Sequence, residues 1–145
     1  MNPSPHRHGS IVGKPSAFVT AVCLLAGCSG LGESVAWHER CQPANYTAES
    51  LDQWFRPTWA VTEGPRGPQV EGYIYNQSTM GTAIRMLVAI ERLDAAGQPV
   101  ECAQVWVSGT VPQDYRAYFA ALVPDAGARY RVRVLTFDWD KRGGS

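Results

Sequence analysis

Residues 83–97 read AIRMLVAIERLDAAG, and this stretch decides the fold class. Every second residue from Ile84 to Ile90 is apolar, which puts Ile84, Met86, Val88 and Ile90 on one side of an extended chain. Asp94, two alanines and Gly97 then supply a turn. The stretch predicts a strand over 83–93 with those four side chains in the core.

The same pattern extends in both directions from residue 58 onward. Runs rich in Val, Ile, Tyr, Phe and Trp alternate with Gly, Pro, Asn and Asp about every ten residues. Further strands are predicted over 58–63, 70–75, 100–107, 115–123 and 130–137. The fold class is therefore all-β, a small sandwich of six to seven antiparallel strands. Besides the third strand, the predicted core comprises Tyr115, Ala117, Phe119, Ala121, Val123, Tyr130, Val132 and Val134.

The beginning of the chain has the three parts of an export signal. His6, Arg7, His8 and Lys14 are basic, residues 17–26 are mostly apolar, and Gly27 is small. The apolar run has about ten residues, whereas a helix needs roughly 20 to cross a bilayer. We interpret it as a cleaved leader.

Leu25-Ala26-Gly27-Cys28 at the end of this leader resembles the lipobox of bacterial lipoproteins. The resemblance implies cleavage before Cys28, acylation of that cysteine, and attachment to the membrane through its acyl chains. Ser29 in place of an aspartate implies the outer membrane, with the protein facing the periplasm. The alternative is an ordinary signal peptide in which Cys28 is incidental.

These observations predict the domain organisation. Residues 1–27 form the signal peptide, 28–57 a lipidated tether, 58–142 the sandwich and 143–145 a flexible tail. The tether has no sustained hydrophobic period, and one short helix is expected near 48–55, led by Thr47.

Cysteine usage agrees with export. Cys23 would leave with the leader and Cys28 would carry lipid, so Cys41 and Cys102 remain as a pair in an oxidising compartment. We predict a disulfide between them, which closes a loop worth on the order of 4 kcal/mol. A redox or metal site is the alternative, but the chain has no C-x-x-C spacing and no histidine cluster.

The order of features over residues 58–139 resembles the FxLYD-type domains of bacterial lipoproteins. The resemblance lies in a strand ending at Asn76, the Leu93-Asp94 pair with Gly97, the stretch from Val111-Pro112 to Arg116 and Phe119, and Pro124 before a last strand. Arg92 departs from the pattern, which has an apolar residue there. The resemblance implies an immunoglobulin-like sandwich and implies little about activity.

Catalytic and metal-binding patterns are sparse. His38 is the one histidine after the leader, and it lies in the predicted tether. Asp138 and Asp140 flank Trp139 and could present two carboxylates on one side of an extended segment, although such a pair is more often the solvated end of a strand. We expect no catalytic residues, metal or cofactor. The thirteen acidic residues all follow residue 28, with eleven of the thirteen basic ones, so nucleic acid is not an expected partner.

Two groups of side chains are candidate binding surfaces. The first is aromatic and suits protein interfaces or sugar stacking, or else it caps the sandwich: Trp37, Trp54, Phe55, Trp59, Tyr73 and Tyr75. The second is an outward row on the last strand, Arg129, Arg131 and Arg133, which could meet phosphates or an acidic partner. Cross-strand pairing with glutamates such as Glu71 or Glu101 is the alternative for the row.

These features predict a lipid-anchored, non-catalytic binding or accessory subunit of a membrane or periplasmic assembly, with another envelope protein as its partner. A carrier or sensor of a small apolar or glycan ligand is one alternative, and it requires the aromatic side chains to line a pocket of a few hundred Å³. A hydrolase of an envelope polymer is another. It requires His38 or the aspartate pair to meet other polar groups in a cleft.

Overall fold

The structure is a computed structural model that describes residues 32–143. Its elements follow in the order β1 (Trp37–His38), α1 (Ala48–Trp54), β2 (Phe55–Gly64), β3 (Gly67–Asn76), β4 (Ala83–Leu93), β5 (Pro99–Trp106), β6 (Arg116–Leu122), β7 (Arg129–Trp139) and the 3-10 turn η1 (Lys141–Gly143). The strand predicted over 83–93 has those bounds, and the other five predicted strands begin and end within three residues of the observed ones. The short helix led by Thr47 is also confirmed, with the Thr47 side chain accepting from Ser50 N.

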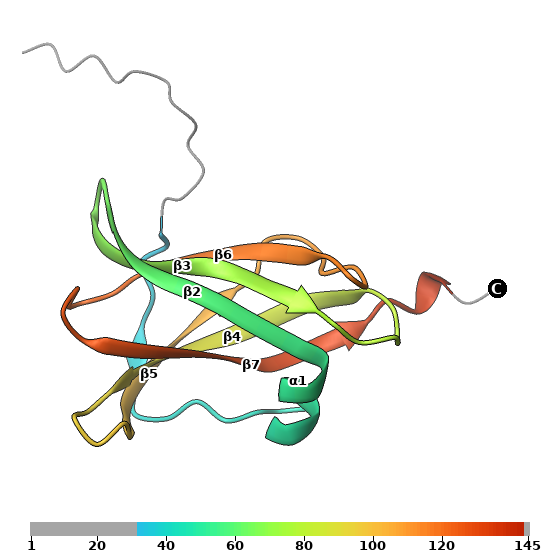
Figure 1. The fold of residues 1–145 in the computed structure, drawn as a ribbon, viewed down its shortest axis with the longest axis horizontal. Coiled ribbons are helices and arrows are strands. Elements are labelled where there is room, and N and C mark those ends of the chain that lie inside the picture. Colours follow the sequence, from blue (N-terminus) through green and yellow to red (C-terminus); the bar gives the residue numbers. More distant parts are fainter. Residues whose placement is uncertain (1–31, 144–145) are drawn as a thin grey trace, which may run out of the picture.

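Two antiparallel sheets pack face to face (Figure 1). One has the strand order β2-β3-β6 and the other β1-β5-β4-β7. If the strands from β2 onward are lettered A, B, C, C′, E and F in chain order, the first sheet has the order A-B-E and the second the order C′-C-F. This is the strand order of immunoglobulin-type sandwiches. The predicted all-β sandwich is confirmed.

The space between the sheets is filled by the side chains that the two-residue period selects. Met86, Val88 and Ile90 are fully buried, as are Phe119, Ala121 and Val132 within a few per cent. Further buried core residues are Ala117, Val123, Tyr130 and Val134 from the predicted set, and Val70, Ile74, Val105, Val107 and Val111 from its neighbours.

Two predicted core positions are wrong, each beside a non-glycine residue with positive φ. Arg85 has φ 51° inside β4, where the pairing with β7 shifts register, so Ala83 is fully buried and Ile84 turns off the core face. Asp114 has φ 62° before β6, and Tyr115 is 69 % exposed. The alternation therefore begins at Arg116.

The segment expected to be a tether is part of the folded domain over its described residues. Trp37 and His38 pair with Ala103 and Cys102 on the edge of β5. The chain then runs along the outer side of the four-stranded sheet to α1 (Figure 1). Before it reaches α1, Ala44 N donates to Leu135 O of β7 at 3.2 Å. Leu51 and Phe55 end in the core, 2 % and 1 % exposed. The apolar residues just before the predicted boundary at residue 57 are thus buried with the residues of the two sheets.

The predicted disulfide is present between Cys41 and Cys102, 61 residues apart in sequence. It fastens the segment before α1 to β5 and forms, with Ala89 and Leu135, a small buried cluster on the outer side of the four-stranded sheet.

The lipobox lies outside the described residues, and so does Cys28. Across residues 32–143 no helix has the length and apolar character needed to span a bilayer.

Candidate functional site

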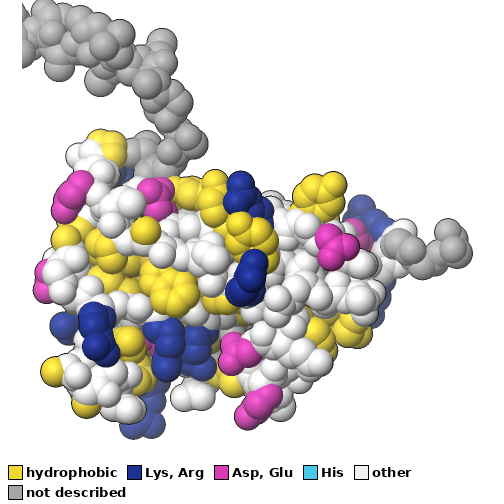
Figure 2. Space-filling view, viewed as in Figure 1, with side chains coloured by type: hydrophobic (Ala, Val, Ile, Leu, Met, Phe, Trp, Pro, Cys, Tyr) yellow, Lys and Arg dark blue, Asp and Glu magenta, His cyan; other side chains and the backbone are white. Residues whose placement is uncertain are grey.

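The outer side of the β2-β3-β6 sheet carries a continuous group of tyrosine and arginine side chains. Strand alternation directs Tyr73 and Tyr75 of β3 to this side, and the register sets them opposite Tyr118 and Arg116 of β6. Arg56 of β2 stands opposite Tyr75 from the other direction. We call these five residues the tyrosine–arginine face. Figure 2 shows exposed hydrophobic and basic side chains gathered next to one another on the molecule.

Arg116 holds the face together. Its guanidinium carbon lies 4.1 Å from the centroid of the Tyr73 ring, and its Nη1 donates to the Tyr75 hydroxyl at 2.8 Å. The guanidinium of Arg56 approaches the Tyr75 ring to 5.2 Å. These are cation–π distances, so each ring has a defined position on an exposed sheet. The hydrogen bond to Tyr75 raises the pKa of Arg116, which stays charged.

Glu71 completes the face on the side of Tyr118. The Tyr118 hydroxyl donates a short hydrogen bond to Glu71 Oε2, and Thr62 Oγ1 donates to Oε1 at 2.9 Å. Gln69 Nε2 donates to the same carboxylate at 3.3 Å. Burial, and then the bond to Glu71, raise the pKa of Tyr118. The carboxylate of Glu71 is thus occupied by donors of its own sheet.

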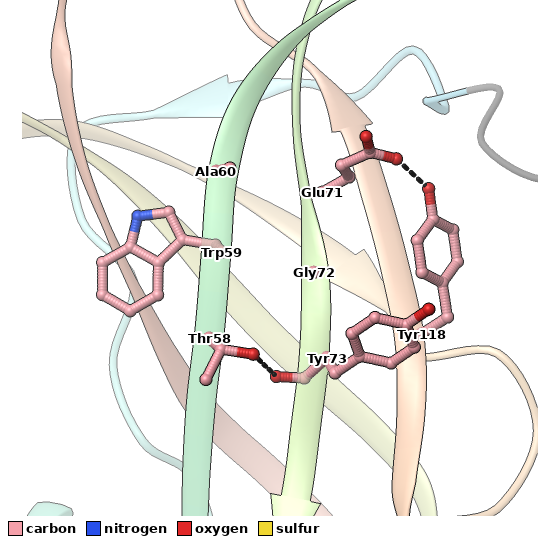
Figure 3. A pocket seen from close by; sticks show the side chains of 7 residues that line it. All are labelled: Thr58, Trp59, Ala60, Glu71, Gly72, Tyr73 and Tyr118. Carbon is pink, nitrogen blue, oxygen red and sulfur yellow. Dashed lines mark hydrogen bonds between the residues drawn. The ribbon is translucent and has the colours of Figure 1, made fainter.

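A shallow groove of about 620 Å³ runs beside Tyr73 and Tyr118. Its floor contains Ala60 and Gly72, and Trp59 projects from the far side of β2, away from the two tyrosines (Figure 3). A Cβ atom on Gly72 would lie 1.9 Å from the carbonyl oxygen of Thr58, so this position accepts no side chain without displacing β2.

The six aromatic residues predicted as one surface lie in three places. Trp54 and Phe55 pack in an aromatic group at the end of the core with Tyr46, Phe137 and Trp139. Trp37 lies 6.4 Å from Tyr130 at the β1 edge. Trp59, Tyr73 and Tyr75 remain on or beside the three-stranded sheet. Some of these side chains therefore cap the core, as the alternative interpretation of the sequence had it, and others lie on the exposed surface.

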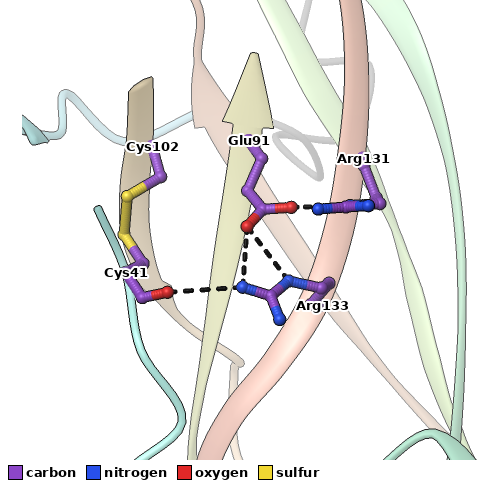
Figure 4. The surroundings of a disulfide bond; sticks show 5 residues. All are labelled: Cys41, Glu91, Cys102, Arg131 and Arg133. Atoms are coloured by element: carbon purple, nitrogen blue, oxygen red, sulfur yellow. Dashed lines mark hydrogen bonds and ion pairs between the residues drawn. A yellow bond between two sulfur atoms is a disulfide. The ribbon is translucent and has the colours of Figure 1, made fainter. Parts of the chain in front are cut away.

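Two of the three arginines in the row on β7 form ion pairs with one buried carboxylate. Arg131 Nε lies 2.6 Å from one oxygen of Glu91, and Arg133 Nη2 lies 2.7 Å from the other (Figure 4). The Glu91 side chain is only 4 % exposed. Cross-strand pairing with a glutamate was the right chemistry, but the partner is Glu91 of β4, while Glu101 pairs with Arg92. Arg129 lies exposed at the start of β7.

The residues considered for hydrolysis lie apart. His38 sits exposed on β1, at one edge of the four-stranded sheet, and Asp138 sits on β7, at the other edge. Asp138 pairs with Arg85 at 2.6 Å, and Asp140 accepts from Arg142 N at 3.0 Å. Within the described part of the chain, no group of three or more His, Cys, Asp or Glu side chains is arranged to hold a metal ion.

Three members of the tyrosine–arginine face, Arg56, Arg116 and Tyr118, were not among the candidate residues that the sequence predicted. Arg116 and Tyr118 alternate with the core positions Ala117 and Phe119, so the two-residue period already directs them outward. Their pairing with β3 joins residues more than 40 positions apart. That long-range register has no local sequence signal.

The fold and the face define a class of protein, an antiparallel sandwich with a preorganised aromatic and basic surface. No protein-family model matches the chain, and comparison with curated proteins and with solved structures gives no match.

Proposed function

We propose that this protein is a lipid-anchored envelope lipoprotein that binds another envelope protein, as a non-catalytic accessory subunit, through the tyrosine–arginine face. The observation that carries the proposal is the Arg116 contact that locks Tyr73 and Tyr75 in place on an exposed sheet. Tyrosine and arginine dominate the energetics of protein interfaces, and a surface that is already ordered loses little entropy on binding.

Charge supports an acidic region on the partner. Within residues 32–143, ion pairs are formed by Arg85, Arg92, Arg131 and Arg133. Arg56 and Arg116 are absent from these pairs and both are exposed. The face therefore presents two cations that carboxylates of a partner can reach.

The lipid anchor rests on different support. Leu25-Ala26-Gly27-Cys28 resembles the lipobox, and the Cys41–Cys102 disulfide fits an oxidising compartment such as the periplasm. We propose attachment through acylated Cys28 to the outer membrane, with the sandwich facing the periplasm.

To test the proposal, the full chain with its leader is expressed in a diderm host and cross-linked, and the proteins bound to it are identified by mass spectrometry. We expect the wild type to capture a specific envelope protein from the membrane fraction, and Cys28→Ser to leave that fraction. The double variant Arg56→Ala/Arg116→Ala should stay in the membrane and lose the partner. Arg66→Ala, an exposed arginine in the β2–β3 turn, is the matched control and should capture as the wild type does.

A different outcome would redirect the proposal. Retention of the same partner by the double variant would exclude the face as the binding surface. A membrane-bound wild type without any partner would favour the second candidate, a carrier of a small apolar or glycan ligand. The groove beside Tyr73 and Tyr118 supports that candidate, because its volume of about 620 Å³ suits a small ligand.

A further inference from the structure

Within residues 32–143, no backbone group bonds to the outer edge of β2, whereas the other sheet edges are covered or guarded. Along β6, Glu33 bonds to Ala120 O and Leu122 N, and Ser108 N donates to Tyr118 O. β1 pairs with the middle of β5. β7 receives Ala44 N at Leu135, has a register shift nearby, and carries a row of charged side chains. Bulges, charges and covering segments are the usual protection of a sheet edge.

The backbone groups that β2 leaves outward follow from one hydrogen bond. Gln77 N donates to Trp54 O at 2.9 Å, and the register of β2 with β3 continues this pairing residue by residue. In an antiparallel pair only every second residue bonds to the neighbouring strand, so the even-numbered residues of β2 bond to β3. The odd-numbered residues direct their N–H and C=O groups away from the sheet. Pro57, which has no N–H, occupies one of these outward positions.

The side chains at this edge suit strand pairing. Residues 58–62 read TWAVT, five consecutive uncharged residues of which four are β-branched or aromatic. The side chains of Trp59 and Val61 are 39 % and 37 % exposed. Both project from the side of β2 that faces the second sheet. A long, uncharged and exposed edge strand is a template for another strand. In Figure 1, β2 forms the outer edge of its sheet.

We propose that β2 pairs with β2 of a second copy of this chain, antiparallel and about a two-fold axis, to form a six-stranded sheet. Charge decides between a parallel and an antiparallel arrangement. Arg56 lies near one end of β2 and Glu63 near the other, so parallel pairing would set each of them beside its own copy, with like charges on the same side of the sheet. Antiparallel pairing avoids this repulsion, because it places the two copies of each residue at opposite ends of the junction. The apolar side chains of Trp59 and Val61 from both copies then meet at the junction and lose their exposure.

The dimer has a consequence for binding. A two-fold axis perpendicular to the joined sheet keeps the outer sides of both copies on one surface. The two tyrosine–arginine faces therefore lie side by side in the dimer, and a partner with two acidic regions would bind by avidity. Pairing at β2 and binding at the face are separable, because the first uses backbone groups at the edge and the second uses side chains of the outer surface.

The test compares the full chain with Val61→Lys and Val100→Lys in sedimentation velocity. Val100 on β5 is 43 % exposed, close to Val61, so the same substitution there controls for added charge. We expect a dimer for the wild type and Val100→Lys, and a monomer with unchanged circular dichroism for Val61→Lys, since a lysine at an edge blocks pairing. Arg116→Ala should remain a dimer.

Hydrogen exchange gives a second readout that needs no variant. In the dimer the amides of Trp59, Val61 and Glu63 are protected, and their protection should fall on dilution of the wild-type protein. A wild type that stays monomeric up to its solubility limit would overturn the proposal. So would a Val61→Lys variant that still dimerises, or protection of these amides that is independent of concentration, which would indicate coverage by another part of the same chain.

Discussion

The guanidinium carbon of Arg116 lies over the Tyr73 ring, 4.1 Å from its centroid, closer than in any other cation–π contact among the described residues. Both side chains belong to the outward positions of neighbouring strands, so neither contributes to the core. An ordered pair on an exposed surface stabilises the fold little and shapes the surface considerably.

Arg116→Ala should therefore separate stability from binding. We expect little change in the free energy of unfolding, because cation–π contacts at a fully exposed side chain contribute little to stability. Capture of the partner should fall at least tenfold. Arg116→Lys keeps the charge and loses the planar fork, so it should restore only part of the binding. Urea unfolding and quantitative cross-linking measure the two effects, and full binding by Arg116→Ala would contradict the assignment of the face.

Among the charged residues, Glu91 should be the one whose substitution lowers the free energy of unfolding most. Its side chain is 4 % exposed and binds two arginines whose side chains are 42 % and 24 % exposed. Glu91→Gln leaves both cations without a carboxylate, and we expect a loss of about 2–3 kcal/mol, below the full cost of breaking a buried pair because the arginines reach solvent. Glu101→Gln, at the more exposed pair with Arg92, is the control and should cost less than about 1 kcal/mol. Equal losses in urea unfolding would show that burial of Glu91 is not what matters.

Removal of the disulfide should loosen the segment before α1. The double variant Cys41→Ala/Cys102→Ala opens a loop of 61 residues, and chain entropy predicts a loss of about 4 kcal/mol. We expect hydrogen exchange to rise first at His38 and Ala44, which bond to the sheet on either side of Cys41. Unchanged exchange at both amides would mean that the strand pairing alone holds the segment.

Local alternation was enough to predict the strands and most of the core. The period of residues 83–93 gave the bounds of β4, and among the predicted core positions it failed at Ile84, where Arg85 adopts a positive φ and the register shifts. The other failure is Tyr115, which follows the positive-φ residue Asp114 and precedes β6. Neither Arg85 nor Asp114 is a glycine, so no composition signal marks these positions. β1 was missed because two residues are too few to show a period.

The candidate site depended on information that no single segment holds. Glu91 is the partner of Arg131 because β4 and β7 set these residues opposite each other, 40 positions apart in sequence. Likewise, Tyr73 meets Tyr118 only through the pairing of β3 with β6. The residue types were enough to predict ion pairs and aromatic contacts. Which residues contact each other depends on the register between strands that are distant in the sequence.

Gly72→Ala should disturb the middle of the three-stranded sheet. The added methyl would lie 1.9 Å from the Thr58 carbonyl oxygen, which belongs to backbone and cannot rotate away. We expect a loss of about 1–3 kcal/mol, typical of overpacking, with faster hydrogen exchange in β2. Gly127→Ala is the control, because its nearest neighbour is a side-chain oxygen of Asp125 at 3.3 Å. A destabilisation no larger than that of the control would show that β2 adapts at little cost.

Tyr118 should make stability depend on pH in the alkaline range. Burial, and then the hydrogen bond and repulsion from Glu71, raise its pKa in the folded protein above the ordinary value of 10.0. The folded state therefore favours the neutral phenol. Its contribution to stability is fully present below pH 10 and is lost as the pH rises through the raised pKa, because the unfolded chain then releases the proton more readily.

Tyr118→Phe should remove this dependence. The difference in free energy of unfolding between wild type and Tyr118→Phe should be constant below pH 9 and shrink above about pH 10. Urea unfolding at a series of pH values measures it, with Tyr115→Phe, at a tyrosine that is 69 % exposed, as the matched control. If wild type and Tyr118→Phe lost stability in parallel above pH 10, the bond from Tyr118 to Glu71 would not favour the neutral phenol over the phenolate. The position of the Tyr118 ring would then have to be held by contacts other than this bond.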